Sequence, residues 1–64
     1  MSEKVFLEIA IDRLQRKIFA TDDSGVAERL FDKLHDLLID NNMSENYFMS
    51  EEGRDLMMYL DELR

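Results

Sequence analysis

One stretch of the chain has a strict helical pattern of apolar residues and constrains the fold more than any other. Between positions 26 and 39, apolar side chains recur every three or four residues, which places them on one face of an α-helix. At 100° per residue they fall within an arc of roughly 140°, and charged side chains occupy the rest of the circumference. The pattern predicts a surface helix over residues 25–40 with one buried face. The seven apolar positions are Val26, Ala27, Leu30, Phe31, Leu34, Leu37 and Leu38.

The N-terminal segment predicts a second helix, over residues 3–19. It contains no glycine or proline, and Ser2 is placed to act as its N-cap. Residues 5–11 are also dense in β-branched and aromatic side chains, which is typical of a short strand. Because the helical period continues to Ile18 and the segment has no hairpin partner, we favour the helix. Its apolar stripe consists of Leu7, Ala10, Ile11, Leu14 and Ile18.

A third helix is predicted over residues 50–63. Ser50 is followed by two acidic residues, which suit the first turn of a helix. Gly53 weakens this turn by about 1 kcal/mol relative to alanine, so this end frays or lets a neighbouring segment approach closely. The apolar face consists of Leu56, Met57, Tyr59, Leu60 and Leu63.

Turn-forming residues separate the three predicted helices. In residues 21–25, the side chains of Asp22, Asp23 and Ser24 are N-cap candidates for the central helix. Either Asn41 or Asn42 can take the left-handed conformation that ends a helix. The pattern of residues 43–49 indicates a polar and aromatic connector or one irregular helical turn. We therefore predict an all-α fold with one domain, residues 1–64, arranged as a small three-helix bundle.

Length and composition limit how this domain is stabilised and where it works. A chain of 64 residues hides only about 60% of the surface that its unfolded form exposes, so its stability is marginal. Zero cysteines exclude disulfides and thiolate metal sites and fit a reducing compartment. The sequence shows no membrane-spanning apolar run and no signal-peptide pattern. We predict a cytoplasmic protein.

The charge balance indicates the kind of partner. Fifteen acidic and eight basic residues give a formal net charge of −7, which disfavours direct binding of nucleic acid or of a membrane surface. A helix-turn-helix DNA reader is disfavoured for the same reason, because the last two predicted helices are net acidic. A basic protein surface is favoured instead, with a solubilising acidic exterior as the alternative. We assign no cofactor, no metal and no enzymatic activity.

Two groups of residues are candidates for binding a partner. On the first helix, apolar side chains project away from the main stripe, which predicts a homodimer seam or a site for another protein, unless this helix lies between the other two. In the C-terminal third, flexible methionines and aromatic residues lie among acidic residues and suit an adaptable contact patch, or fill gaps in the core. The first group is Val5, Phe6 and Ile9. The second is Tyr47, Phe48, Met49, Glu51, Glu52, Asp55, Met58, Asp61 and Glu62.

Two other features of the sequence are candidates for chemical sites. The interval from Asp40 to Glu51 resembles an EF-hand calcium loop, with oxygen-bearing side chains at its first, third, fifth, seventh and twelfth positions. Glu45 stands where such a loop needs glycine, and Tyr47 where it needs a small aliphatic residue. His35, the single histidine, lies at the edge of the central apolar arc and is read as boundary packing, with acid–base chemistry as the alternative.

The sequence therefore predicts a non-enzymatic interaction module that docks on a basic surface of a partner protein. An inhibitor or modulator of a nucleic-acid-binding protein fits this description. Such small acidic inhibitors are often encoded by viruses and mobile elements, although only the size suggests that origin. The alternative is a structural self-association unit, a homodimeric helical bundle whose acidic surface only keeps it in solution. A calcium-binding loop over residues 40–51 is the minor alternative.

Overall fold

The computed structural model describes residues 3–64, which form α-helices and no strand. The helices are α1 (Glu3–Ala20), α2 (Ser24–Asp40), α3 (Ser44–Met49) and α4 (Glu51–Leu63). The all-α prediction is confirmed, and the strand alternative for residues 5–11 is wrong because α1 covers them. The N-cap candidate Ser2 lies outside the described residues.

Within that range the chain has four helices, so the prediction of three is wrong in number. The extra helix, α3, occupies most of the segment expected to be a connector or one irregular helical turn, and the second alternative is the nearer one. Its six residues are too few to show a helical period in the sequence. Tyr47 and Phe48 hold it in place, because both pack against the core. Ser50 then takes an extended conformation that separates α3 from α4, with φ −75° and ψ 159°.

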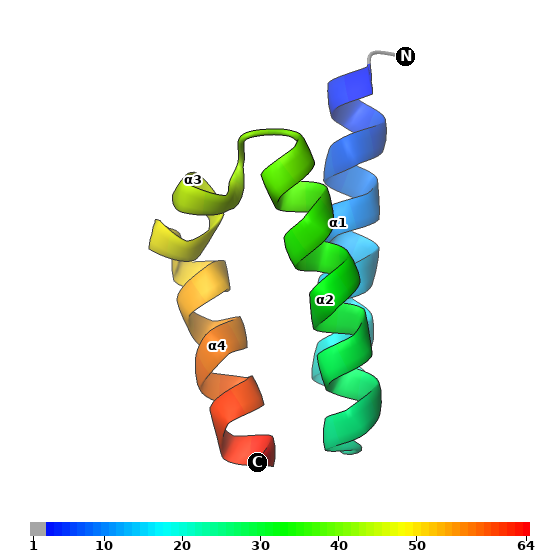
Figure 1. Ribbon diagram of the computed structural model, residues 1–64, viewed down its shortest axis with the longest axis vertical. Coiled ribbons are helices and arrows are strands. Elements are labelled where there is room, and N and C mark those ends of the chain that lie inside the picture. Colours follow the sequence, from blue (N-terminus) through cyan, green and yellow to red (C-terminus); the bar gives the residue numbers. More distant parts are fainter. Residues whose placement is uncertain (1–2) are drawn as a thin grey trace.

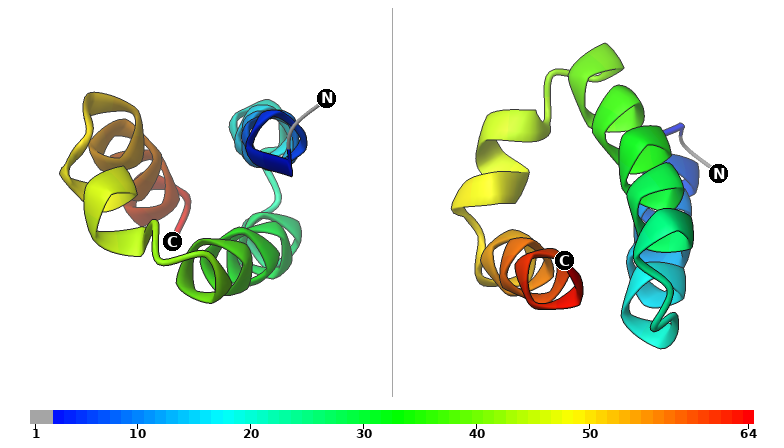
Figure 2. Two further views of the ribbon diagram at one scale, coloured as in Figure 1. Left: turned by 90° about the horizontal axis from the view of Figure 1, so that it is seen from above. Right: turned by 60° about the horizontal axis from the view of Figure 1, so that its bottom comes forward.

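The three long helices surround a common interior. α1 and α2 run antiparallel and side by side, and α4 returns antiparallel to α2, so that α1 and α4 point the same way (Figure 1). Seen from above, α2 neighbours both of them, while the side of the molecule opposite α2 is bordered by α1 and α4 (Figure 2). α3 lies above the start of α4.

The core is formed by apolar side chains from the three long helices. Val26 and Met57, which were assigned to the buried faces, are exposed at the edges of α2 and α4, so that part of the prediction is wrong. Both lie beside their helix's buried stripe, which is narrower than the predicted arc. The buried residues are Ile11, Ile18, Ala27, Leu34, Leu38, Leu56 and Leu60.

Polar side chains fix where the helices begin and end. Among the three N-cap candidates for α2, Asp23 has that role: its Oδ1 accepts from the backbone N–H groups of Gly25 and Val26 at 2.9 and 3.2 Å. Asn42 follows α2 with a left-handed φ of 56°, as predicted for one of the two asparagines. Ser50 Oγ accepts from the Gly53 N–H at 3.2 Å and starts α4.

Candidate functional site

A groove lies between α1 on one side and α3 and α4 on the other. Its volume is about 390 Å³. Ile11, Met43 and Tyr47, all buried or half-buried, give it an apolar floor. The Tyr47 hydroxyl donates to Gln15 Oε1 at 2.8 Å and so joins α3 to α1 across the groove. The full lining is Glu8, Ile11, Asp12, Gln15, Met43, Asn46, Tyr47 and Glu52.

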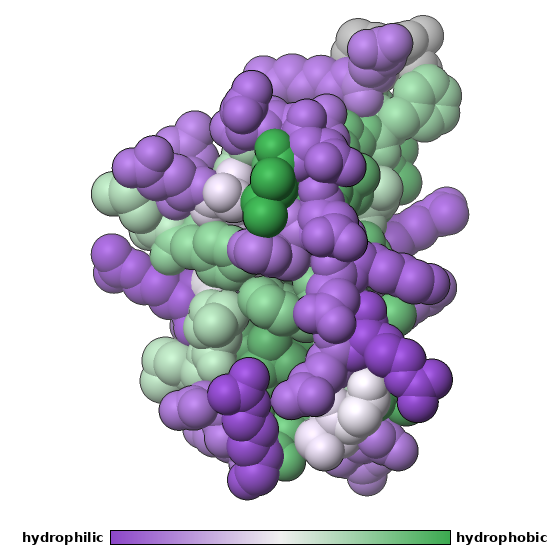
Figure 3. Space-filling view, in the orientation of Figure 1, coloured by the Kyte–Doolittle hydropathy of each residue, from purple (hydrophilic) through white to green (hydrophobic). Residues whose placement is uncertain are grey.

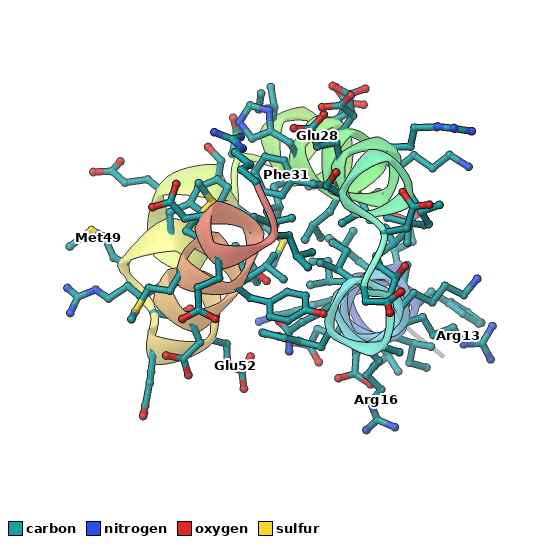
Figure 4. All side chains as sticks on the ribbon, turned by 90° about the horizontal axis from the view of Figure 1, so that it is seen from below. Arg13, Arg16, Glu28, Phe31, Met49 and Glu52 are labelled. Atoms are coloured by element: carbon teal, nitrogen blue, oxygen red, sulfur yellow. The ribbon has the colours of Figure 1, made fainter. Side chains whose placement is uncertain are left out.

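Carboxylates border this floor. Glu8, Asp12 and Glu52 are all exposed, and among the described residues that line the groove there is no lysine or arginine. Arg16, one turn along α1, forms an ion pair with Asp12, and its Nε lies 3.0 Å from Asp12 Oδ2. In Figure 4, Glu52 and Arg16 point out from α4 and α1 on the side away from α2. The groove therefore combines an apolar floor with an acidic rim.

Tyr47 reports on the electrostatics of the floor. Burial raises the pKa of its hydroxyl, and the negative charge of Glu52 raises it further, to about 12. Both effects disfavour the phenolate. The neutral hydroxyl is thus the donor to Gln15 at all pH values at which proteins normally work.

This pKa shift predicts a pH dependence of stability. The folded-state pKa lies above the ordinary tyrosine value of 10.0, so the stabilisation is fully present below pH 10 and is lost as the pH rises through about 12. We expect the free energy of unfolding to fall over this window, and Tyr47→Phe to fall less steeply. Urea unfolding at a series of pH values measures both, with Tyr59→Phe as the matched control. An equal slope for the wild type and Tyr47→Phe contradicts the prediction.

The N-terminal candidates lie on the outer face of α1, away from the core. Val5, Phe6 and Ile9 are exposed, and the Phe6 side chain keeps 59% of its accessible surface. The alternative in which this segment is covered by the other helices is therefore wrong. A shallow depression on the same face is lined by α1 alone, with Arg13 and Lys17 beside Phe6 and Ile9.

The C-terminal candidates are divided between two places. Tyr47 and Glu52 line the groove, and Phe48 turns toward the core, where its ring centroid lies 6.1 Å from that of Phe31. Met49 and Met58 are exposed, and Met49 projects away from the groove side (Figure 4). Met49 and Met58 are therefore not part of one continuous patch with the groove. The acidic candidates Glu51, Asp55, Asp61 and Glu62 are exposed on α4.

His35 lies at the boundary of the core, which confirms the packing interpretation. Its ring stacks on Phe31 with centroids 5.8 Å apart and an interplanar angle of 18°, and it also contacts Phe48. The side chain is half-buried. The imidazole is thus part of a small aromatic cluster between α2 and α3.

The interval from Asp40 to Glu51 is not an open loop. α3 fills its centre, so Ser44 and Asn46 lie on a helix instead of turning inward around a cation. Residues 3–64 contain no group of three or more histidine or acidic side chains that could hold a metal ion. The geometry gives the calcium interpretation no support.

Sequence reasoning missed the α1 side of the groove. Glu8, Asp12 and Gln15 follow the i, i+4, i+7 spacing of one helix face beside Ile11, a signal that is present in the sequence. Their significance depends on α3 and α4 lying opposite, which periodicity within one helix does not show. Met43 and Asn46 were assigned to the connector and reach the groove because α3 is helical.

Comparison with protein-family models, with curated proteins and with solved structures found no match to this chain. Among residues 3–64, no helix has both the length and the hydropathy that crossing a bilayer requires.

Proposed function

We propose that this protein is a non-enzymatic acidic interaction module that docks on a basic surface of a partner protein. The observation that carries the proposal is the groove with an apolar floor, in which Ile11 and Tyr47 lie beneath the carboxylates of Glu8 and Glu52. Apolar contacts supply affinity, and carboxylates steer encounter with a basic partner. The formal net charge of −7 acts in the same direction over longer distances.

A nucleic-acid-binding protein is the class of partner that fits best. Its binding surface is rich in lysine and arginine, which the exposed carboxylates of this chain match in the way that phosphates do. Occupying such a surface blocks the nucleic acid, so the module acts as an inhibitor or modulator. We place this activity in the cytoplasm, where the absence of cysteine carries no cost.

A pull-down at two salt concentrations tests the proposal. The immobilised protein is incubated with cell lysate at low and at high salt, and we expect a basic protein to be retained only at low salt, because salt screens exposed charges. The partner is then purified and its binding to nucleic acid measured with and without the module. Retention of no basic protein, or of partners that salt does not release, contradicts the proposal.

A second candidate function is structural self-association, and one observation favours it. Val5, Phe6 and Ile9 are exposed apolar side chains close together on α1, and apolar side chains grouped in this way can form part of an interface between copies. Light scattering over a range of concentrations measures the mass against the 7.6 kDa of one chain. A dimer that the double substitution Phe6→Ser with Ile9→Ser converts to monomer supports this function. A wild-type monomer at micromolar concentration rules out an obligate dimer.

A further inference from the structure

We propose that the groove takes a cationic amphipathic helix of the partner, which lies between α1 and α4. This inference rests on the proposed function and narrows it from a basic surface to one element of secondary structure. Helix-in-groove binding needs an apolar trough long enough for several turns and flanks that match the charge of the incoming helix. In this protein the two requirements correspond to the apolar floor of the groove and the charged flanks on α1 and α4.

Below the cavity, an aromatic contact joins α1 and α4 in place of an open groove, and Phe19 stays partly exposed there. Phe19 of α1 and Tyr59 of α4 meet with ring centroids 5.3 Å apart, and the Tyr59 hydroxyl donates to the Thr21 carbonyl. Ile11 and Tyr47 form the upper floor. Glu8, Asp12 and Gln15 of α1 and Glu52 of α4 line the cavity. By their spacing, Phe19 continues the α1 set, and Asp55, Tyr59 and Glu62 continue the α4 set. Each set has the spacing of one helical face, so a helix laid over the cavity can also reach the Phe19–Tyr59 contact below it.

The position of α1 and α4 suits a fourth long helix. They run in the same direction on either side of α2, and the side opposite α2 has no helix of its own within the described chain (Figure 2). Packed helices approach to about 8–10 Å between axes and interdigitate their side chains. A partner helix laid over the groove therefore contacts both α1 and α4. Together with α1, α2 and α4 it forms a four-helix bundle.

Charge specifies the chemistry of that helix. Exposed carboxylates border the cavity on both sides, Glu8 and Asp12 on α1 and Glu52 on α4. Asp55 and Glu62 are exposed too and share the helical face of Glu52 by their spacing. The α1 wall has Glu8 and Asp12, and Asp12 is paired with Arg16. Figure 3 shows the face over α2 and α4, which lies on the far side from the groove. There too, hydrophilic side chains surround a central apolar strip. The occupant has an apolar stripe flanked on both sides by lysine or arginine.

Synthetic peptides test this inference. The probe is a labelled helix-forming peptide of about 18 residues with leucines at the i, i+3, i+4, i+7 spacing and lysines on both flanks. One control has the same composition in scrambled order, and a second has glutamate in place of lysine. Fluorescence anisotropy measures the dissociation constant. We expect the scrambled peptide to bind at least about tenfold more weakly and the glutamate peptide not to bind.

Two double variants with equal changes in net charge locate the site. Glu8→Lys with Glu52→Lys reverses both rims of the groove, whereas Asp36→Lys with Asp61→Lys reverses exposed carboxylates on the outer faces of α2 and α4. We expect the first pair to weaken binding of the amphipathic peptide at least about tenfold and the second less than about threefold. Circular dichroism confirms that both variants remain helical.

The outcomes separate this inference from the proposed function. Equal weakening by the two double variants, or equal affinity for the scrambled peptide, overturns the helix-in-groove inference. The inference is also overturned if the lysine peptide does not bind and the protein instead forms dimers through the groove, which the groove variant would dissociate. In each of these cases the proposed function is still supported if the pull-down retains a basic partner that high salt releases. Failure of every cationic peptide together with an empty pull-down overturns both.

Discussion

Gly53→Ala is expected to lower the free energy of unfolding by about 3 kcal/mol, although alanine is the better helix former. Gly53 is buried in the first turn of α4, directly against α3. A Cβ atom there overlaps the Tyr47 carbonyl oxygen and comes within 2.8 Å of its carbonyl carbon and 3.0 Å of Phe48 Cα. These are backbone atoms, so relief requires α3 to move away from α4. Urea unfolding measures the change.

Gly25→Ala is the matched control. A Cβ atom at this exposed position meets only Asp23 Oδ1, at 3.3 Å, and that side chain can shift by a few tenths of an ångström. We expect the free energy of unfolding to change by no more than about 1 kcal/mol. If both substitutions have the same effect, close approach of α3 is not what makes glycine necessary at Gly53.

The Gly53 variant also affects the groove. Tyr47 belongs to the displaced segment, and its hydroxyl joins α3 to Gln15 of α1. Movement of α3 therefore lengthens this hydrogen bond and exposes the tyrosine, so the pKa of Tyr47 returns toward 10 from about 12. Ultraviolet titration of the tyrosines detects this shift even where the variant remains folded.

Much of the fold could be predicted from the sequence because local signals specify it. The periods of the long helices, Asp23 as one of three N-cap candidates, and the asparagines after α2 depend only on near neighbours along the chain. At Gly53 the sequence left two alternatives, fraying or close approach of a neighbour, and the structure has the close approach. Such features need no knowledge of the tertiary arrangement.

The groove could not be predicted in the same way. α3 has no periodic pattern of its own, and tertiary contacts of Tyr47 and Phe48 hold it in helical form. Without α3, the polar row of Glu8, Asp12 and Gln15 reads as an ordinary solvated face. The exposed side chains of Val5, Phe6 and Ile9 were predicted because an apolar residue off the main stripe is visible in one helix alone.

Leu38→Ala is expected to lower the free energy of unfolding by about 3 kcal/mol through the cavity that it leaves. Leu38 has 0% of its surface exposed and lies in the core between α2 and the other long helices. A domain of this size has a total stability of about 3–10 kcal/mol, so the loss takes a large share of it. Urea unfolding and the dispersion of amide NMR signals measure how much of the protein remains folded.

The adjacent residue provides the control for this prediction. Ile39 is 50% exposed, and Ile39→Ala removes a similar volume from the surface of the same helix turn. Because the exposed methyl groups lose little contact and water fills the space, we expect a loss below about 1 kcal/mol. The difference between the two variants then measures burial, since helix propensity changes by a similar small amount in both. Equal losses at the two positions place the core elsewhere and contradict the arrangement of α2 against α1 and α4.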